Sequence, residues 1–341
     1  MNESRKTYLD SLNTLRGLAA FSVCIFHFTN GNRFFLPPED VFRKAGFYGS
    51  FGVQVFFVIS GLVIPFSMYK VQYRLSDIKT FLLKRIVRIE PPYLISFLLV
   101  LLLNIISSVL PHYQGKPLNT DPVFLLGHLG YMNSFLHLEW INPVYWTLAI
   151  EFQYYLLIAL LFPLISSKNN IVLVTTAVLF NAVSWFLPDP NFIFYYSFYF
   201  TLGIAICKYL VNDLSKPYFL ITVLISLAGI FVQFRLPGLV AGLIPLGFSF
   251  ISWENRVTHF LGNISYSLYL LHVPVGLRII NISRQWYESE SMRYIAILVA
   301  IAITLVAAYL FYRYVELPFK KMSQKIRYSE KRGMKMALQN I

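Results

Sequence analysis

The stretch "LRGLAAFSVCIFHF", residues 15–28, has the apolar character of a membrane-spanning helix but carries two side chains that such helices usually exclude. It lies in an apolar run from 12 to 30, which is long enough to cross the roughly 30 Å hydrocarbon core of a bilayer. The two exceptions are Arg16 and His27. On an ideal helix they share one face and lie about 16 Å apart along the axis.

The composition of the whole chain is that of a polytopic membrane protein. Of its 341 residues, 57% are hydrophobic and 13% are charged, and the mean hydropathy is +0.58. A soluble domain averages about 25% charged residues. We therefore predict an all-α membrane protein, and we assign the net charge of +13 to membrane lipids rather than to nucleic acid because of where the basic residues lie.

Apolar runs of about 17–25 residues predict about ten spanning helices. One region is open to two interpretations, because Leu236, Pro237 and Gly238 form either a tight turn between two helices or a break within a re-entrant pair. The predicted spans are 12–30, 49–69, 86–110, 144–166, 171–187, 192–209, 217–234, 237–252, 261–281 and 293–312.

The basic residues predict that both termini are cytoplasmic. With ten spans and an inner N-terminus, roughly three quarters of the 29 Lys and Arg residues fall in inner loops and tails, as expected because basic loops resist translocation. This pattern favours a multi-pass protein of the inner (cytoplasmic) membrane. We also expect the first apolar run to be retained, because it ends without a small-residue cleavage site.

Two segments outside the spans are expected to contact lipid. The outer loop 111–143 contains apolar runs such as 123–126, and we expect it to be partly ordered at the membrane interface. The basic tail 321–341 is expected on the anionic cytoplasmic leaflet, which leaves 1–320 as one transmembrane domain.

One acid lies at the depth of His27. The fourth predicted span begins "VYWTLAIEFQYY", and counting along the helix places its Glu151 about 10 Å below the outer surface, against about 8 Å for His27. A carboxylate and an imidazole at matching depth suit a pair in which Glu151 orients His27 as a general base. The alternative is two separately satisfied polar groups, since equal depth does not make two helices adjacent.

Three arginines are expected near the inner face. Arg85 and Arg88, in "FLLKRIVRIEPPYL", lie on neighbouring parts of one helix face, and Arg16 lies at a similar level on the first helix. Guanidinium groups bind phosphates through paired hydrogen bonds, so this cluster suits a phosphorylated ligand. The alternatives are the ordinary excess of basic residues on the inner side and, for Arg16, a side chain that extends to the interface.

The ninth predicted span carries a polar stripe in "SYSLYLLH". Ser265, Tyr269 and His272 follow at spacings of four and three, so the stripe faces a protein interior, either a cavity or a packed helix. Cys24 lies one turn from His27, where a thiol activated by histidine would carry an acyl group; we favour a small buried hydrophobic residue instead.

Taken together, these motifs resemble the acyltransferase-3 family of integral membrane O-acyltransferases. The resemblance covers nearly the whole chain. In order, it rests on Arg16 and His27 in "LNTLRGLAAFSVCIFHF", then "GVQVFFVISGLVI", Arg85 and Arg88 followed by "PPY", "WTLAIEFQYY", "LGNISYSLYLLH" and the "ELP" that contains Glu316 and Pro318. Thr147 stands where the family usually has serine.

The resemblance implies about ten helices around a cavity and transfer of an acyl group, most often acetyl, from cytoplasmic acetyl-CoA to a hydroxyl of an exported glycan or its lipid-linked precursor. Within that scheme we predict His27 and Glu151 as catalytic residues and expect no metal. The predicted donor-binding residues are Arg16, Arg85, Arg88, Ser265, Tyr266 and Tyr269, and the predicted substrate-binding residues are Trp146, Tyr154 and His272.

A transporter or flippase is the alternative function, with the intramembrane His and Glu as a proton relay. The sequence argues against it, because it contains no inverted repeat and no paired broken helices.

Overall fold

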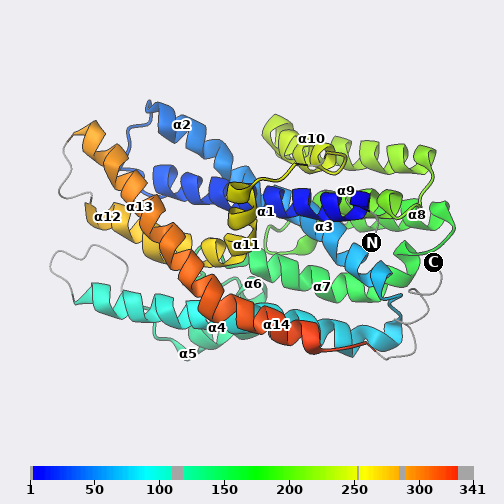
Figure 1. Cartoon of the computed structure of the whole chain (residues 1–341), viewed down its shortest axis with the longest axis horizontal. Coiled ribbons are helices and arrows are strands. Elements are labelled where there is room, and N and C mark those ends of the chain that lie inside the picture. Colours follow the sequence, from blue (N-terminus) through cyan, green and yellow to red (C-terminus); the bar gives the residue numbers. More distant parts are fainter. Residues whose placement is uncertain (1–2, 110–117, 252, 284–288, 329–341) are drawn as a thin grey trace.

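The computed structural model describes residues 3–109, 118–251, 253–283 and 289–328, and every regular element within these ranges is helical. The predicted all-α class is therefore confirmed. Most helices run roughly along one long axis, and α13 (Glu290–Phe311) crosses the bundle obliquely (Figure 1). The start of α1 (Glu3–Asn30) and the end of α14 (Leu317–Lys325) lie at the same end of the bundle (Figure 1).

Glycines allow the closest helix crossings. At the crossing of α1 with α11 (Arg256–Leu271), a Cβ atom on Gly17 would lie 2.5 Å from the backbone nitrogen of Gly262. At the crossing of α3 (Gly52–Lys70) with α9 (Ser197–Leu210), a Cβ atom on Gly203 would collide with the carbonyl oxygen of Val58. Small residues let helix backbones approach each other in lipid, where apolar burial alone does not drive association.

The element α10 (Lys216–Phe248) consists of two antiparallel arms. Arg235 has φ 57° and ψ −161°, which breaks the helix. Beyond it, a Cβ atom on Gly242 would lie 3.2 Å from Ile230, although twelve residues of straight helix would separate the two by about 18 Å. The chain therefore folds back on itself just before Pro237, as both interpretations of this segment require.

Six helical segments in the described part of the chain are long and apolar enough to cross a membrane: Val41–Lys70, Leu75–Ser108, Trp146–Ile165, Ile193–Leu210, Lys216–Phe248 and Ser291–Lys325. The predicted count of ten is not confirmed by this criterion. The remaining predicted spans correspond to α1, whose polar side chains lower its hydropathy, to the shorter α8 (Asn170–Phe186), to the second arm of α10, and to α11 with the turns that follow it.

Two π-helical turns interrupt the C-terminal helices, each followed or accompanied by proline. The first, His272–Leu277, joins α11 to α12 (Arg278–Ser283), and the second, Tyr312–Glu316, joins α13 to α14. Pro274 has no N–H to donate to the carbonyl of Leu270 four residues earlier. That carbonyl accepts a hydrogen bond from the side-chain amide of Asn142 instead, at 3.2 Å.

The segment between α4 (Ile78–Ser108) and α7 (Trp146–Ile165) is folded where it is described. It contains α5 (Pro122–Gly127) and α6 (Asn133–Leu136), with His128 and Tyr131 buried and apolar side chains such as Leu126 exposed. The expected partial order is confirmed for 118–143, and residues 111–117 of the predicted loop lie outside the described residues.

The C-terminal helix docks on the start of α4. The ammonium group of Lys84 donates to the carbonyl oxygens of Ser323 and Ile326, at 2.9 and 2.6 Å, and the hydroxyl of Ser323 donates to the carbonyl of Lys84 at 2.9 Å. The predicted boundary at 321 therefore falls within α14, and residues 329–341 of the predicted tail lie outside the described residues.

Candidate functional site

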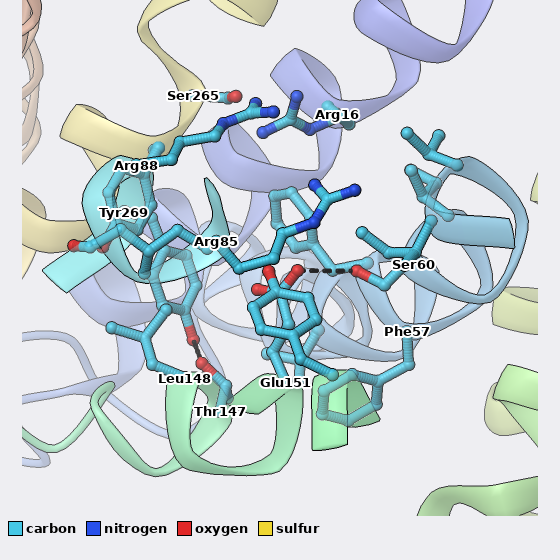
Figure 2. Close-up of a pocket in the computed structure, with 18 of the residues that line it drawn as sticks. Arg16, Phe57, Ser60, Arg85, Arg88, Thr147, Leu148, Glu151, Ser265 and Tyr269 are labelled. Atoms are coloured by element: carbon cyan, nitrogen blue, oxygen red, sulfur yellow. Dashed lines mark hydrogen bonds between the residues drawn. The ribbon is translucent and has the colours of Figure 1, made fainter. Parts of the chain in front are cut away.

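A polar cavity of about 110 Å³ is enclosed by α1, α3, α4, α7, α11 and the second π-helical turn (Figure 2). Six of the residues predicted to bind the donor line it, and Glu151 lines it as well. The lining residues are Arg16, Val53, Phe56, Phe57, Ile59, Ser60, Val63, Ile64, Arg85, Arg88, Ile89, Thr147, Leu148, Glu151, Tyr155, Ser265, Tyr266, Tyr269 and Glu316.

Three guanidinium groups converge on this cavity. Arg16 and Arg88 interact electrostatically, and their guanidinium ends lie together beside Ser265 (Figure 2). Arg85 donates to the hydroxyl of Ser67 at 2.8 Å, and its guanidinium carbon lies 5.7 Å from the ring centre of Tyr155. Among the residues that the structure describes, none forms an ion pair with any of the three, so like charges face one another without a neutralising contact.

Two carboxyl groups, on α7 and on the second π-helical turn, line the same cavity. Glu151 accepts a hydrogen bond from the hydroxyl of Ser60 at 3.0 Å (Figure 2), and Glu316 accepts one from Ser267 at 2.6 Å. Both acids act electrostatically on Arg16 from beyond ion-pair distance. The space between the charged groups therefore has room for an anion, which would pair with guanidinium groups that have no carboxylate in direct contact.

Several hydroxyl groups in the cavity lining, which is otherwise largely apolar, are held by hydrogen bonds. The hydroxyls of Thr147 and Tyr269 bond each other at 2.8 Å (Figure 2). Tyr266 donates to the carbonyl of Ile89 at 2.9 Å, and Ser265 donates to the carbonyl of Gly262 at 2.9 Å. The threonine in place of the family's usual serine thus keeps a hydroxyl that bonds Tyr269.

The structure does not pair His27 with Glu151. His27 lies in the last turn of α1, half-buried, with its ring centre 5.1 Å from that of His272. His272 is fully buried and lies 5.6 Å, centre to centre, from Tyr269, which itself lines the cavity. The two histidines therefore form a cluster that begins where the cavity ends, behind Tyr269.

The other predicted substrate-binding residues pack away from the cavity. Trp146 packs against Phe57 and Tyr196, with ring centres 6.3 and 5.6 Å apart. Tyr154 is buried and stacks on Phe200, with ring centres 4.3 Å apart. Cys24 is buried as well, in an apolar cluster of α1, α11 and α13, in agreement with the apolar role that we favoured.

The sequence interpretation missed several polar groups of the site. Ser60, Ser67 and Tyr155 carry no signal beyond their position inside apolar segments. Glu316 does carry one, because an acid in the last apolar segment is as exceptional as Glu151 in the fourth, and "ELP" marked it. Among the side chains that the structure describes, no cluster of three or more His, Cys, Asp or Glu is arranged to hold a metal ion.

Comparison with known proteins gives a family match and several curated relatives. A family model described as an acyltransferase domain, Acyl_transf_3, matches residues 9–313. The O-acetyltransferases OatA of Staphylococcus aureus strains NCTC 8325 / PS 47, COL and MRSA252 are each 24% identical to the chain over 369 residues. The alignment covers 93% of this chain but 58% of each relative, so the chain spans less than two thirds of their length. No solved structure matches the chain.

Proposed function

Because the chain belongs to the acyltransferase-3 family of membrane acyltransferases, we propose that it moves an acetyl group from cytoplasmic acetyl-CoA to a hydroxyl of a surface glycan or its lipid-linked precursor. The observation that carries the proposal is the cavity with three guanidinium groups and no ion-pair partner for them among the described residues. Such a cavity suits the phosphate groups of a nucleotide donor.

The proposed orientation puts the arginine end of the cavity at the cytoplasmic face. We propose ten crossings of the inner membrane, with the two arms of α10 counted separately, and cytoplasmic termini. The described chain ends lie at one end of the bundle, as an even number of crossings requires (Figure 1). The basic residues of the inner loops support the cytoplasmic side for that end.

In the proposed reaction, the arginines hold the donor and its thioester extends past Ser265, Tyr266 and Tyr269 toward His27. The imidazole of His27 takes the proton of the acceptor hydroxyl, whose oxygen attacks the thioester carbonyl. The carbon–sulfur bond then breaks, and the thiolate of CoA leaves and takes the proton from His27. Glu151 remains in the arginine-lined part of the cavity. Its carboxylate, which accepts the hydrogen bond from Ser60, limits the excess of positive charge there.

The test uses the purified protein in vesicles with acetyl-CoA labelled in the acetyl group, with and without a glycan acceptor. We expect acceptor-dependent release of CoA with label in the glycan, and His27→Ala lowers that rate about 10²–10⁴-fold. His259→Ala, which changes an exposed histidine bound to Glu254, keeps the wild-type rate. Label that crosses the membrane without release of CoA would contradict the proposal and favour a transporter.

A further inference from the structure

The position beside His27 that the sequence assigned to Glu151 is occupied by a second histidine. His27 and His272 come from different helices and pack ring against ring, with centres 5.1 Å apart. We infer that His272 is a positioning residue for His27 in acyl transfer: its Nε2 accepts the ring N–H of His27 and thereby directs the other nitrogen of His27 at the acceptor hydroxyl. This inference rests on the proposed function.

The tautomer of His272 follows from its one hydrogen bond. Its Nδ1 lies 3.1 Å from the carbonyl oxygen of Leu268. A carbonyl oxygen only accepts hydrogen bonds, so Nδ1 must carry the hydrogen. In the neutral ring the lone pair is then on Nε2, which makes this nitrogen an acceptor.

That acceptor has no partner in the described residues, although it is fully buried. The side chain of His272 has 0% exposure, and Nε2 is among the few buried polar atoms without a hydrogen bond. Buried polar atoms of this kind are costly and rare, so they point to a partner that is bound in another state of the protein.

The rings of His27 and Tyr269 both pack against that of His272, and His27 is the nearer, with ring centres 5.1 Å apart against 5.6 Å. Two imidazoles joined by an N–H···N bond of roughly 2.9 Å have ring centres roughly 5 Å apart, which is the separation seen here. In this inference the half-buried His27 ring turns so that its N–H points at Nε2 of His272. Hydrogen bonds between catalytic groups are often long before substrate binds and shorten in the reacting complex.

The backbone holds His272 in place for this role. His272 begins a π-helical turn, a feature that often marks functional sites. Asn142 donates to the carbonyl of Leu270, which Pro274 leaves without its helical partner, and this bond fixes the start of the turn. On the other side, the carbonyl of His27 accepts the N–H of Gly31 at 2.9 Å, which closes the end of α1.

The chemistry needs no further proton acceptor. The proton goes from the acceptor hydroxyl to His27 and from there to the departing thiolate of CoA. His272 keeps its own proton on Nδ1 throughout, and its lone pair stabilises the His27 imidazolium that forms in between. His272 touches neither donor nor acceptor in this scheme, so it acts through His27 alone.

The experiment measures kcat and KM for acetyl-CoA in the vesicle assay. His272→Phe keeps an aromatic ring but has no lone pair, and we expect kcat to fall about 10–100-fold with KM within about twofold of wild type. His272→Gln offers an amide oxygen as acceptor and recovers most of the rate. In a His27→Ala background, His272→Phe has no further effect, because the residue through which it acts is gone.

Four results would overturn the inference: an unchanged kcat in His272→Phe, a raised KM at unchanged kcat, an additive loss in the double variant, or the same loss in Thr304→Val. The last control removes the hydroxyl of Thr304, a second buried polar group without a hydrogen bond, which lies against Gly276 of the same turn. Size-exclusion profiles identify any variant that misfolds; if His272→Phe does, His272→Leu, which also has no acceptor nitrogen, replaces it in the cycle. A wild-type protein without acceptor-dependent CoA release, or His27→Ala with full activity, would remove the proposed function itself and this role with it.

Discussion

Two polar side chains of α1 have opposite surroundings: Arg16 lies in the middle of the helix and His27 in its last turn. Arg16 opens on a cavity in which charged groups face one another without ion pairs, whereas His27 lies in a small cluster against a buried ring. Charge left unpaired inside a membrane protein is costly and indicates a ligand that supplies the missing partner. Under the proposed function, Arg16 therefore binds the donor and His27 takes part in the chemistry, so the two roles lie at different levels of one helix.

The strongest test of this comparison changes the arginine end. Arg16→Gln combined with Arg88→Gln removes two charge-assisted contacts to the donor, each worth about 1.5–3 kcal/mol. We expect KM for acetyl-CoA to rise about 100-fold or more, with kcat close to wild type, as measured by initial rates in vesicles.

Arg74→Gln is the matched control, because Arg74 is an exposed arginine near the start of α4 and does not line the cavity. It should leave KM unchanged. An equal loss of kcat in the double variant and no change in KM would show that the arginine end takes part in the chemistry, and the separation of roles along α1 would be wrong.

The sequence predicted which arginines line the cavity, but it did not predict that His272 lies beside His27. Arg16, Arg85 and Arg88 are conspicuous because charge in an apolar run is rare, and depth along each helix brought them to one level. The same count along the helix axis paired His27 with Glu151. Depth carries no information about which helices touch, and the tight crossing at Gly17 and Gly262 puts α11, with His272 just beyond its end, beside α1.

The fold was predictable where a local signal sets it. The apolar runs located most helices to within a few residues, for example α7 at Trp146–Ile165 against the predicted 144–166. The start of α4 at Ile78 lies eight residues before the predicted span, because its first two turns contain Lys79, Lys84 and Arg85 and do not look like a membrane segment; Lys84 contacts α14 instead. The π-helical turn at His272 likewise depends on a contact with Asn142 from a distant segment.

The next test acts on the helix crossing at Gly17, which follows Arg16 on α1. Gly17→Ala places a Cβ atom 2.5 Å from the backbone nitrogen of Gly262, and neither backbone is able to move without separating α1 from α11. We expect a loss of about 1–3 kcal/mol in stability and a fall in kcat, because His27 and His272 lie on these two helices. Thermal unfolding in detergent and the vesicle assay measure both effects.

Gly247→Ala is the control for helix propensity, since a Cβ atom there meets nothing within 4 Å. This variant is expected to keep or slightly raise the unfolding temperature. If Gly17→Ala behaves in the same way, the two helices are not in the tight contact on which the pairing of the histidines depends.

A smaller effect is expected at Tyr269, which lies between the cavity and the two histidines. Thr147→Val removes the hydroxyl that bonds Tyr269, at a cost of about 0.5–1.5 kcal/mol, and loosens the ring that separates the cavity from His272. We expect kcat to fall up to about tenfold with little change in KM, and Thr147→Ser to restore it. A rise in KM alone would instead assign Thr147 to donor binding.

The smallest effect concerns a third histidine, which contrasts with His272 because both of its ring nitrogens are bonded. The Nδ1 of His128 donates to the carbonyl of Phe124 at 2.8 Å, and its Nε2 accepts the N–H of Ile141 at 3.1 Å. Burial lowers the pKa of His128 below its ordinary value near 6.5. The folded segment therefore binds the proton less readily than the unfolded one, so its stability is complete above that pH and decreases as the pH falls through it.

Hydrogen exchange of amides 122–141 between pH 7.5 and 5.5, corrected for intrinsic rates, measures this loss. We expect protection to decrease at the acid end, because a protonated Nε2 places one N–H against another. In His128→Phe the segment is weaker at every pH and loses the pH dependence, whereas His137→Asn, at an exposed residue with φ 50°, keeps it. Protection that is independent of pH in the wild type would mean that the bond to Ile141 contributes little. The contrast between His128, whose ring bonds stabilise its segment, and His272, whose Nε2 has no hydrogen bond in the described residues, would then depend on His272 alone.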